Sequence, residues 1–119
     1  MKGSYLGEFE EIILLLVAML GEDAYGLAIR EAFMDQTGRS AAIGAVHSAL
    51  NRLEDKKFLT SKMADATSER GGRRKRIFSV TSEGKTALEH SRELRNSIWE
   101  QIPRVNWEEV KFIPVFNYR

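Results

Sequence analysis

The sequence predicts a mainly α-helical fold with one small β-hairpin. Three helical segments come first, two short β-rich segments joined by a glycine-containing loop follow, and a long helical segment comes next. The chain has 119 residues, of which 43% are hydrophobic and 29% charged. This size and composition are those of one folded domain.

The first helix is expected over residues 8–20. Three glutamates in its first turn complement the positive end of the helix dipole, and Gly21 supplies a stop signal. Residues 12–20 are uniformly apolar, so one surface of a small domain cannot cover every side of this helix. We therefore expect Ile12 and Leu16 to contact a partner chain.

The second and third helices are expected over residues 24–36 and 41–56. Asp23 and Ser40 are the candidate caps at their starts, and Gly38 stands where the second helix should end. The third helix has an apolar arc on one side, formed by Ile43, Val46, Leu50 and Leu53. Its opposite face is small and polar, with Gly44, Ser48, Asn51 and Arg52.

The hairpin is expected from strands at residues 58–63 and 74–81, joined by a polar loop that ends in two glycines. Thr81 is the candidate cap of a fourth helix over residues 82–101. This helix has a narrow apolar seam typical of pairing with another helix, formed by Ala87, Ser91, Leu94, Ile98 and Ile102. The remaining residues, 103–119, are unusually apolar for a tail, and we expect them to pack against another surface.

Three helices followed by a hairpin is the plan of a winged helix-turn-helix domain. In that plan the third helix enters the major groove of DNA and the hairpin, or wing, contacts the DNA backbone. We accordingly divide the chain into a winged helix-turn-helix domain at residues 1–81, a C-terminal dimerisation helix at 82–102 and an apolar tail of unknown role at 103–119. The expected dimer surface on the fourth helix consists of Leu94, Ile98, Trp99 and Ile102.

The distribution of charge supports contact with nucleic acid, although the net charge is only +1. The wing is the most cationic stretch of the chain, with Arg70, Arg73, Arg74, Lys75 and Arg76. Arginine forks beside two glycines suit phosphate oxygens, whereas a charge run by itself can be a merely solvated face. Together with the wing, the expected DNA-binding residues are Ser40, Gly44, His47, Ser48, Asn51 and Arg52.

Several segments in this order also resemble the PadR-like family of bacterial winged-helix transcriptional regulators. The segments are residues 6–11, 24–26, 44–54, 70–76 and 80–84. The third-helix stretch and the double-glycine wing are the specific part, and the length resembles the short branch of the family. The resemblance implies a homodimer held by the helix after the wing, which represses genes by binding near-palindromic operators on double-stranded DNA.

Two residues have alternative interpretations. His47 stands where many family members have tyrosine, so it is either a donor to a DNA phosphate or a half-buried packing residue. Trp99 is either an anchor of the dimer seam or, as the resemblance implies, a residue on which a flat aromatic small-molecule effector stacks.

The sequence argues against enzymatic chemistry. The chain has no cysteine, its two histidines lack partners at zinc-binding spacing, and neither a G-x-S-x-G elbow nor a complete phosphate-binding loop occurs. We expect no cofactor, no metal site and no catalytic residue. The longest apolar run is too short to span a bilayer, so we expect a cytoplasmic protein without membrane contact. The alternative function is a winged-helix protein-interaction module or adaptor that does not bind DNA.

Overall fold

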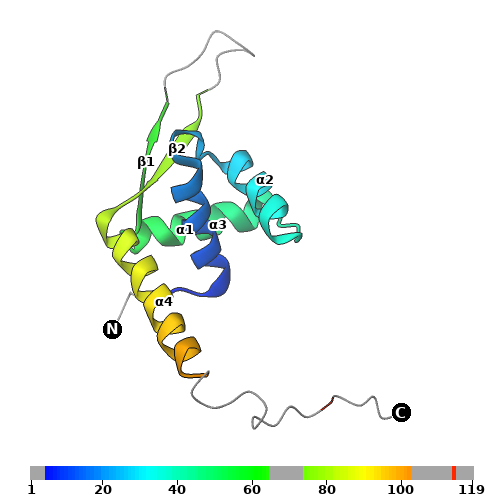
Figure 1. Cartoon of the computed structure of the whole chain (residues 1–119). Helices are drawn as coiled ribbons and strands as arrows, with labels where there is room; N and C mark the ends of the chain where they lie inside the picture. Colours follow the sequence, from blue (N-terminus) through cyan, green and yellow to red (C-terminus); the bar gives the residue numbers. More distant parts are fainter. Residues whose placement is uncertain (1–4, 65–73, 103–113, 115–119) are drawn as a thin grey trace.

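In the computed structural model, residues 5–64, 74–102 and 114 are described. Their elements are α1 (Glu8–Leu20), the 3-10 turn η1 (Gly21–Asp23), α2 (Gly26–Thr37), α3 (Ile43–Asp55), β1 (Leu59–Met63), β2 (Arg76–Val80) and α4 (Ser82–Gln101). The mainly helical fold with one hairpin is confirmed. As Figure 1 shows, α1, α2 and α3 cluster together, the hairpin stands beside them, and the C-terminal part of α4 extends beyond the other helices.

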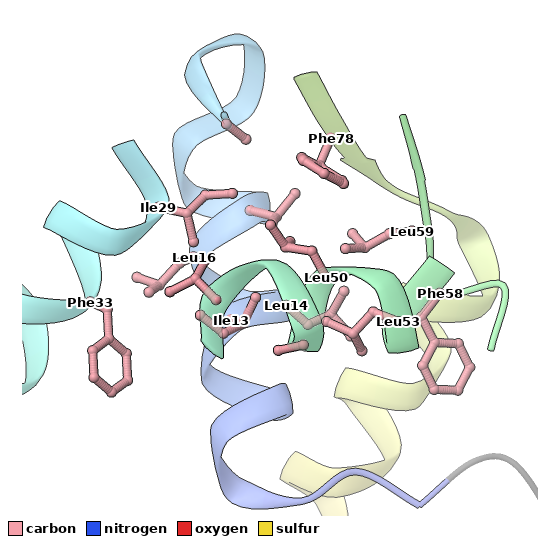
Figure 2. Close-up of a cluster of buried hydrophobic side chains, with 14 of the residues drawn as sticks. Ile13, Leu14, Leu16, Ile29, Phe33, Leu50, Leu53, Phe58, Leu59 and Phe78 are labelled. Carbon is pink, nitrogen blue, oxygen red and sulfur yellow. The ribbon is translucent and has the colours of Figure 1, made fainter. Parts of the chain in front are cut away.

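The core lies where α3 crosses α1 and is closed by α2 and the hairpin (Figure 2). Its fully buried side chains come from all of these elements and include Ile13, Leu14, Ile29, Phe33, Leu50, Leu53 and Phe78. No polar or charged residue among those described is buried. Burial of apolar surface therefore holds the domain together and fixes the angle of α3.

β1 and β2 form the expected antiparallel hairpin, with Leu59 opposite Val80 and Met63 opposite Arg76. The strands are shorter than predicted, and the loop that carries Arg70 and Arg73 lies outside the described residues. Lys75 and Arg74 directly precede β2, and the Ala64 amide donates to the Lys75 carbonyl at 2.7 Å. The base of the wing is thus a regular extension of the hairpin.

Several predicted helix ends are confirmed. α1 covers residues 8–20 as expected, and α2 ends at Gly38, whose φ of 72° is the left-handed conformation that glycine adopts without strain. Thr81 caps α4, because its hydroxyl accepts a hydrogen bond from the Gly84 amide at 3.0 Å.

The predicted starts of α2 and α3 are wrong. Asp23 belongs to η1, and α2 begins at Gly26. The Ala24 carbonyl accepts from the Phe78 amide of β2 at 2.9 Å, so it is not available to a helix that would start at Ala24. Ser40 caps nothing, and α3 begins at Ile43 after Ala42. Here the Arg30 side chain donates to the Ala41 carbonyl at 2.8 Å. In both places a tertiary hydrogen bond replaces the expected local cap.

Candidate nucleic-acid interface

The exposed face of α3 is the centre of the candidate interface. Its opposite face is buried, with Val46, Ala49, Leu50 and Leu53 each at 0% exposure, whereas Ile43 at the start of the predicted apolar arc is 36% exposed. The exposed face carries the predicted residues Gly44, His47, Ser48, Asn51 and Arg52. Because the buried face is anchored in the core, these side chains are presented on a rigid helix.

Gly44 leaves open space on this face. Apart from its chain neighbours and the backbone of its own helix, no atom lies within 4 Å of the position that a Cβ would occupy there, so packing inside the chain does not require glycine. Ser40 is also exposed, in the turn before α3. A second macromolecule can therefore approach the N-terminal half of α3 closely.

His47 is exposed and its ring lies against the first residue of α2. A Cβ on Gly26 would stand 2.8 Å from His47 Cε1 and 3.1 Å from Nε2. The ring therefore packs on the α2 backbone without being enclosed. This placement leaves both interpretations of His47 open, because a packed ring can still donate from its outer edge.

The base of the wing continues this surface. The Lys75 ammonium lies 4.0 Å from the centre of the Tyr25 ring, at the residue that precedes α2. Such a cation–π contact, together with the bond from Phe78 to Ala24, fixes the wing relative to α2. Sequence reasoning missed Tyr25, and the only signal for it was its place in one of the segments that carry the family resemblance.

The other described wing cations are Arg74 and Arg76, and both are exposed. Arg74 donates through Nε to the Ala64 carbonyl at 2.9 Å, and Arg76 donates to the Ser61 hydroxyl at 2.8 Å. The hairpin backbone and side chains thus orient both guanidinium groups. Each arginine keeps further N–H donors for an outside acceptor.

Three glutamates in the first turn of α1 bind cations from the turn after α2, from the C-terminal end of α3 and from α4, a feature that sequence reasoning missed. Glu8 binds Arg39 at 3.1 Å, and Glu11 binds Arg95 of α4 at 3.3 Å. Glu10 accepts from Arg52 at 2.6 Å and from Lys56 at 2.7 Å. The sequence indicates only a helix-dipole role for the acidic first turn, because these partners are 31 or more residues away along the chain.

These contacts shift the titration of two of the glutamates. The hydrogen bonds and positive charge of Arg39 lower the pKa of Glu8. Burial by itself raises the pKa of Glu10, but the hydrogen bonds from Lys56 and Arg52 outweigh burial and lower its pKa overall. Glu10 is therefore a firmly ionised carboxylate directly beside the exposed face of α3.

The residues predicted to form a dimer surface lie in two environments. Leu94, Ile98 and Trp99 are 54%, 58% and 66% exposed on α4, and Ile102 is partly exposed. On α1, Ile12 is half-buried, whereas Leu16 is only 4% exposed because it packs in the core of its own chain. Leu16 is thus removed from the expected dimer surface. The large apolar side chains that α1 exposes are Leu15 and Met19.

Neither a membrane span nor a metal cluster is found in the described part of the chain. None of its helices is long and apolar enough to cross a membrane. No three of its His, Asp and Glu side chains gather in a way that could hold a metal ion.

Three helices, the third with a free polar face, beside a two-stranded hairpin with a cationic base define a winged helix-turn-helix protein. The model of the transcriptional regulator PadR-like family matches residues 13–90, and the chain belongs to this family. The resemblance in its sequence is thereby confirmed. The protein is a transcription regulator rather than an enzyme.

Solved structures share the fold. The chain is similar to a PadR-like transcription factor from Bacteroides fragilis, with 20% identity, a TM-score of 0.67 and coverage of 82% of this chain and 88% of the other. It is similar to a PadR family regulator from Eggerthella lenta, with 20% identity, a TM-score of 0.62 and coverage of 82% and 85%.

A third similar structure is Bacillus subtilis PadR in complex with operator DNA. Its identity to this chain is 20%, its TM-score is 0.58, and the match covers 93% of this chain and 52% of that longer chain. No curated protein sequence matches this chain.

Proposed function

We propose that this regulator is a homodimeric, sequence-specific DNA-binding protein that represses genes from near-palindromic operators. In this proposal α3 enters the major groove and the wing contacts phosphates on either side. The observation that carries the proposal is α3 itself, whose apolar face is packed in the core while its exposed face offers small and polar side chains around Gly44, Ser48 and Asn51. The cationic Arg52 stands at the border of this face, and the acidic Asp55 stands at its C-terminal end. Such a face suits base edges and phosphates better than it suits an apolar protein surface.

The wing supports the same function. Lys75 on Tyr25 and the oriented guanidinium groups of Arg74 and Arg76 form a cationic margin beside α2 and α3. Arg70 and Arg73 belong to the same cationic stretch of sequence but lie outside the described residues. A protein-docking wing should instead be apolar, so this charge favours DNA over the alternative of an interaction module.

Dimerisation is supported by apolar side chains that the single chain leaves uncovered. Leu94 and Ile98 line a groove of about 430 Å³ together with Tyr5 and Leu6. On the other side of α4, Leu15 and Leu88 line a second groove of about 350 Å³. A two-fold partner that places its own α4 along these grooves would cover both. Trp99 lines neither groove, so its roles as a dimer anchor and as an effector site stay predictions.

The direct test is selection of bound fragments from random double-stranded DNA by the purified wild-type protein. We expect one enriched sequence with two inverted half-sites whose centres are about 10 base pairs, or a multiple of that, apart, as two α3 helices in successive major grooves require. Absence of any enriched sequence would contradict the proposal and favour the protein-interaction module.

Arg74→Ala is expected to flatten the salt dependence of DNA binding. Each phosphate that an arginine neutralises contributes about −0.9 to the slope of log affinity against log salt concentration, so the slope should lose roughly one unit per wing. The affinity for selected and for random DNA should fall alike, because a phosphate contact does not read sequence. The measurement is fluorescence anisotropy with labelled duplexes over a salt series.

Lys85→Ala is the matched control for this prediction. This variant also removes one exposed positive charge, but the charge is on α4, away from the wing. There Lys85 Nζ lies 3.8 Å from Glu89 Oε2. Its slope should equal that of the wild type. A wild-type slope for Arg74→Ala would place that side chain off the DNA.

Asn51→Ala is expected to relax base preference at one position of each half-site. An asparagine side chain suits bidentate contact with adenine, and loss of such a pair costs about 1–3 kcal/mol of discrimination. Because Asn51 is exposed in the free chain, the stability of the protein should not change. Repeating the DNA selection with the variant checks this, and an unchanged preference at every position would show that Asn51 does not read a base.

A further inference from the structure

Glu10 occupies an unusual place for an acid in a DNA-binding domain. Its side chain is only 12% exposed, in the first turn of α1. Its carboxylate bridges two cations four residues apart, Arg52 in the last turn of α3 and Lys56, which directly follows that helix. One oxygen accepts from Arg52 Nε at 2.6 Å and the other from Lys56 Nζ at 2.7 Å. Lys56 also donates to the Tyr5 carbonyl at 3.0 Å. The ammonium group is therefore turned toward α1 and the segment before it.

Arg52 is held differently from Lys56. Glu10 binds only its Nε, and within the described ranges no hydrogen bond uses the two terminal amino groups. The Arg52 side chain stays 52% exposed. A guanidinium group is planar, so fixing Nε on one side sets the direction of the outer pair of donors. The outer edge of Arg52 is thus oriented toward solvent before any ligand arrives.

The position of Arg52 on α3 selects a class of acceptor for this outer edge. Arg52 follows Asn51 directly and comes four residues after Ser48, which puts it at the border of the exposed face rather than at its centre. When a helix lies in the major groove, residues at the border of its exposed face are closest to the phosphates of the groove wall. Two outer N–H groups of a guanidinium match the oxygens of one phosphate.

A carboxylate at this place has an electrostatic cost. It cancels one of the two positive charges of Arg52 and Lys56, and it repels phosphates that approach α3. Its charge alone therefore weakens DNA binding, so any strengthening by Glu10 must come from geometry.

We propose that Glu10 is a positioning residue for DNA recognition, which holds Arg52 by Nε so that its outer amino groups bind a phosphate at the edge of the groove that α3 enters. This inference rests on the proposed DNA-binding function. In this proposal Glu10 contributes to DNA recognition through Arg52, because a carboxylate is repelled by phosphates and does not bind them itself.

The test is Glu10→Gln, with affinities measured for the DNA fragment that the wild-type protein selects and for a random duplex of equal length. We expect affinity for the selected fragment to fall about tenfold, as for loss of one well-oriented charge-assisted hydrogen-bond pair, although the variant is more positive than the wild type. Affinity for random duplex should fall by a similar factor, because a phosphate contact does not read sequence. A purely electrostatic role of Glu10 predicts the opposite result, tighter binding to both.

Glu11→Gln is the matched control. Glu11 lies in the same helical turn, its side chain is 17% exposed, and its partner is Arg95 of α4 instead of a residue of α3. The charge change is therefore the same while α3 is not involved, and the affinity for the selected fragment should not fall. An equal fall in both glutamine variants would overturn the proposal, because loss of a negative charge raises affinity for DNA and the fall would then reflect a general loss of stability.

Arg52 variants separate positioning from a general effect on the fold. Adding Glu10→Gln to Arg52→Ala should cause no further loss of affinity, since the group that Glu10 orients is already absent. Arg52→Lys should lose about as much affinity as Glu10→Gln, because an ammonium keeps the charge but lacks the fork. Either an additive double variant or wild-type binding by Arg52→Lys overturns the inference. If the wild type selects no DNA fragment at all, the proposed function fails first, and the two failures are distinguishable.

Discussion

Replacing Gly84 by alanine is expected to lower the free energy of unfolding by about 3 kcal/mol, the upper part of the usual range for overpacking in a well-packed site. A Cβ at this position would lie 2.3 Å from the Phe58 carbonyl oxygen and 3.0 Å from Val80 Cγ1. The Phe58 carbonyl cannot retreat cheaply, because it also accepts a hydrogen bond from the Thr81 amide at 3.1 Å. Helix α4 can begin beside β1 only if residue 84 has no side chain.

The measurement is thermal unfolding followed by circular dichroism at a fixed protein concentration, and we expect Tm to fall by roughly 10–20 °C. Gly44→Ala is the control, because that position is also helical but has open space around the missing Cβ. Alanine there should leave stability unchanged or raise it by about 0.5–1 kcal/mol through helix propensity. Equal stability of the two variants would contradict the tight approach of α4 to Phe58.

Local patterns predicted the fold because most of its boundaries are set locally. Gly38 ends α2 and Thr81 starts α4 through contacts with residues only a few positions away, and such signals are visible in the sequence. The starts of α2 and α3 could not be predicted in this way. They are set by Phe78 bonding to Ala24 and by Arg30 bonding to Ala41, which pair residues from different elements.

The candidate interface shows the same division. The apolar arc of α3 predicted which face would be free, and the clustering of cations predicted where the wing would be basic. The orientation of those cations was not predictable, because Arg52 and Lys75 are placed by Glu10 and Tyr25, which are distant in sequence. Burial of Leu16 was missed for a related reason: an all-round apolar helix does not show which side its own domain covers.

The double variant Leu94→Asp with Ile98→Asp is expected to split the dimer without unfolding the chain. Both side chains are more than half exposed in the single chain, so aspartate at these positions meets solvent in the monomer. In the dimer the same two carboxylates would be buried in the groove beside Tyr5. Arg95 also lines this groove but is already paired with Glu11, so it offsets only part of the cost of burying them. We expect sedimentation velocity at micromolar concentration to show a wild-type dimer and a helical, monomeric variant.

Thr86→Asp with Ser97→Asp is the matched control, because it adds two carboxylates to α4 at exposed positions that line neither groove. The control should remain dimeric. DNA affinity should fall steeply in the Leu94 and Ile98 variant, since one chain can occupy only one of two half-sites and loses the gain from linked binding. A monomeric wild type, or a monomeric variant with full affinity for the selected fragment, would contradict the two-fold architecture. Recognition would then have to be explained by one α3 and one wing alone.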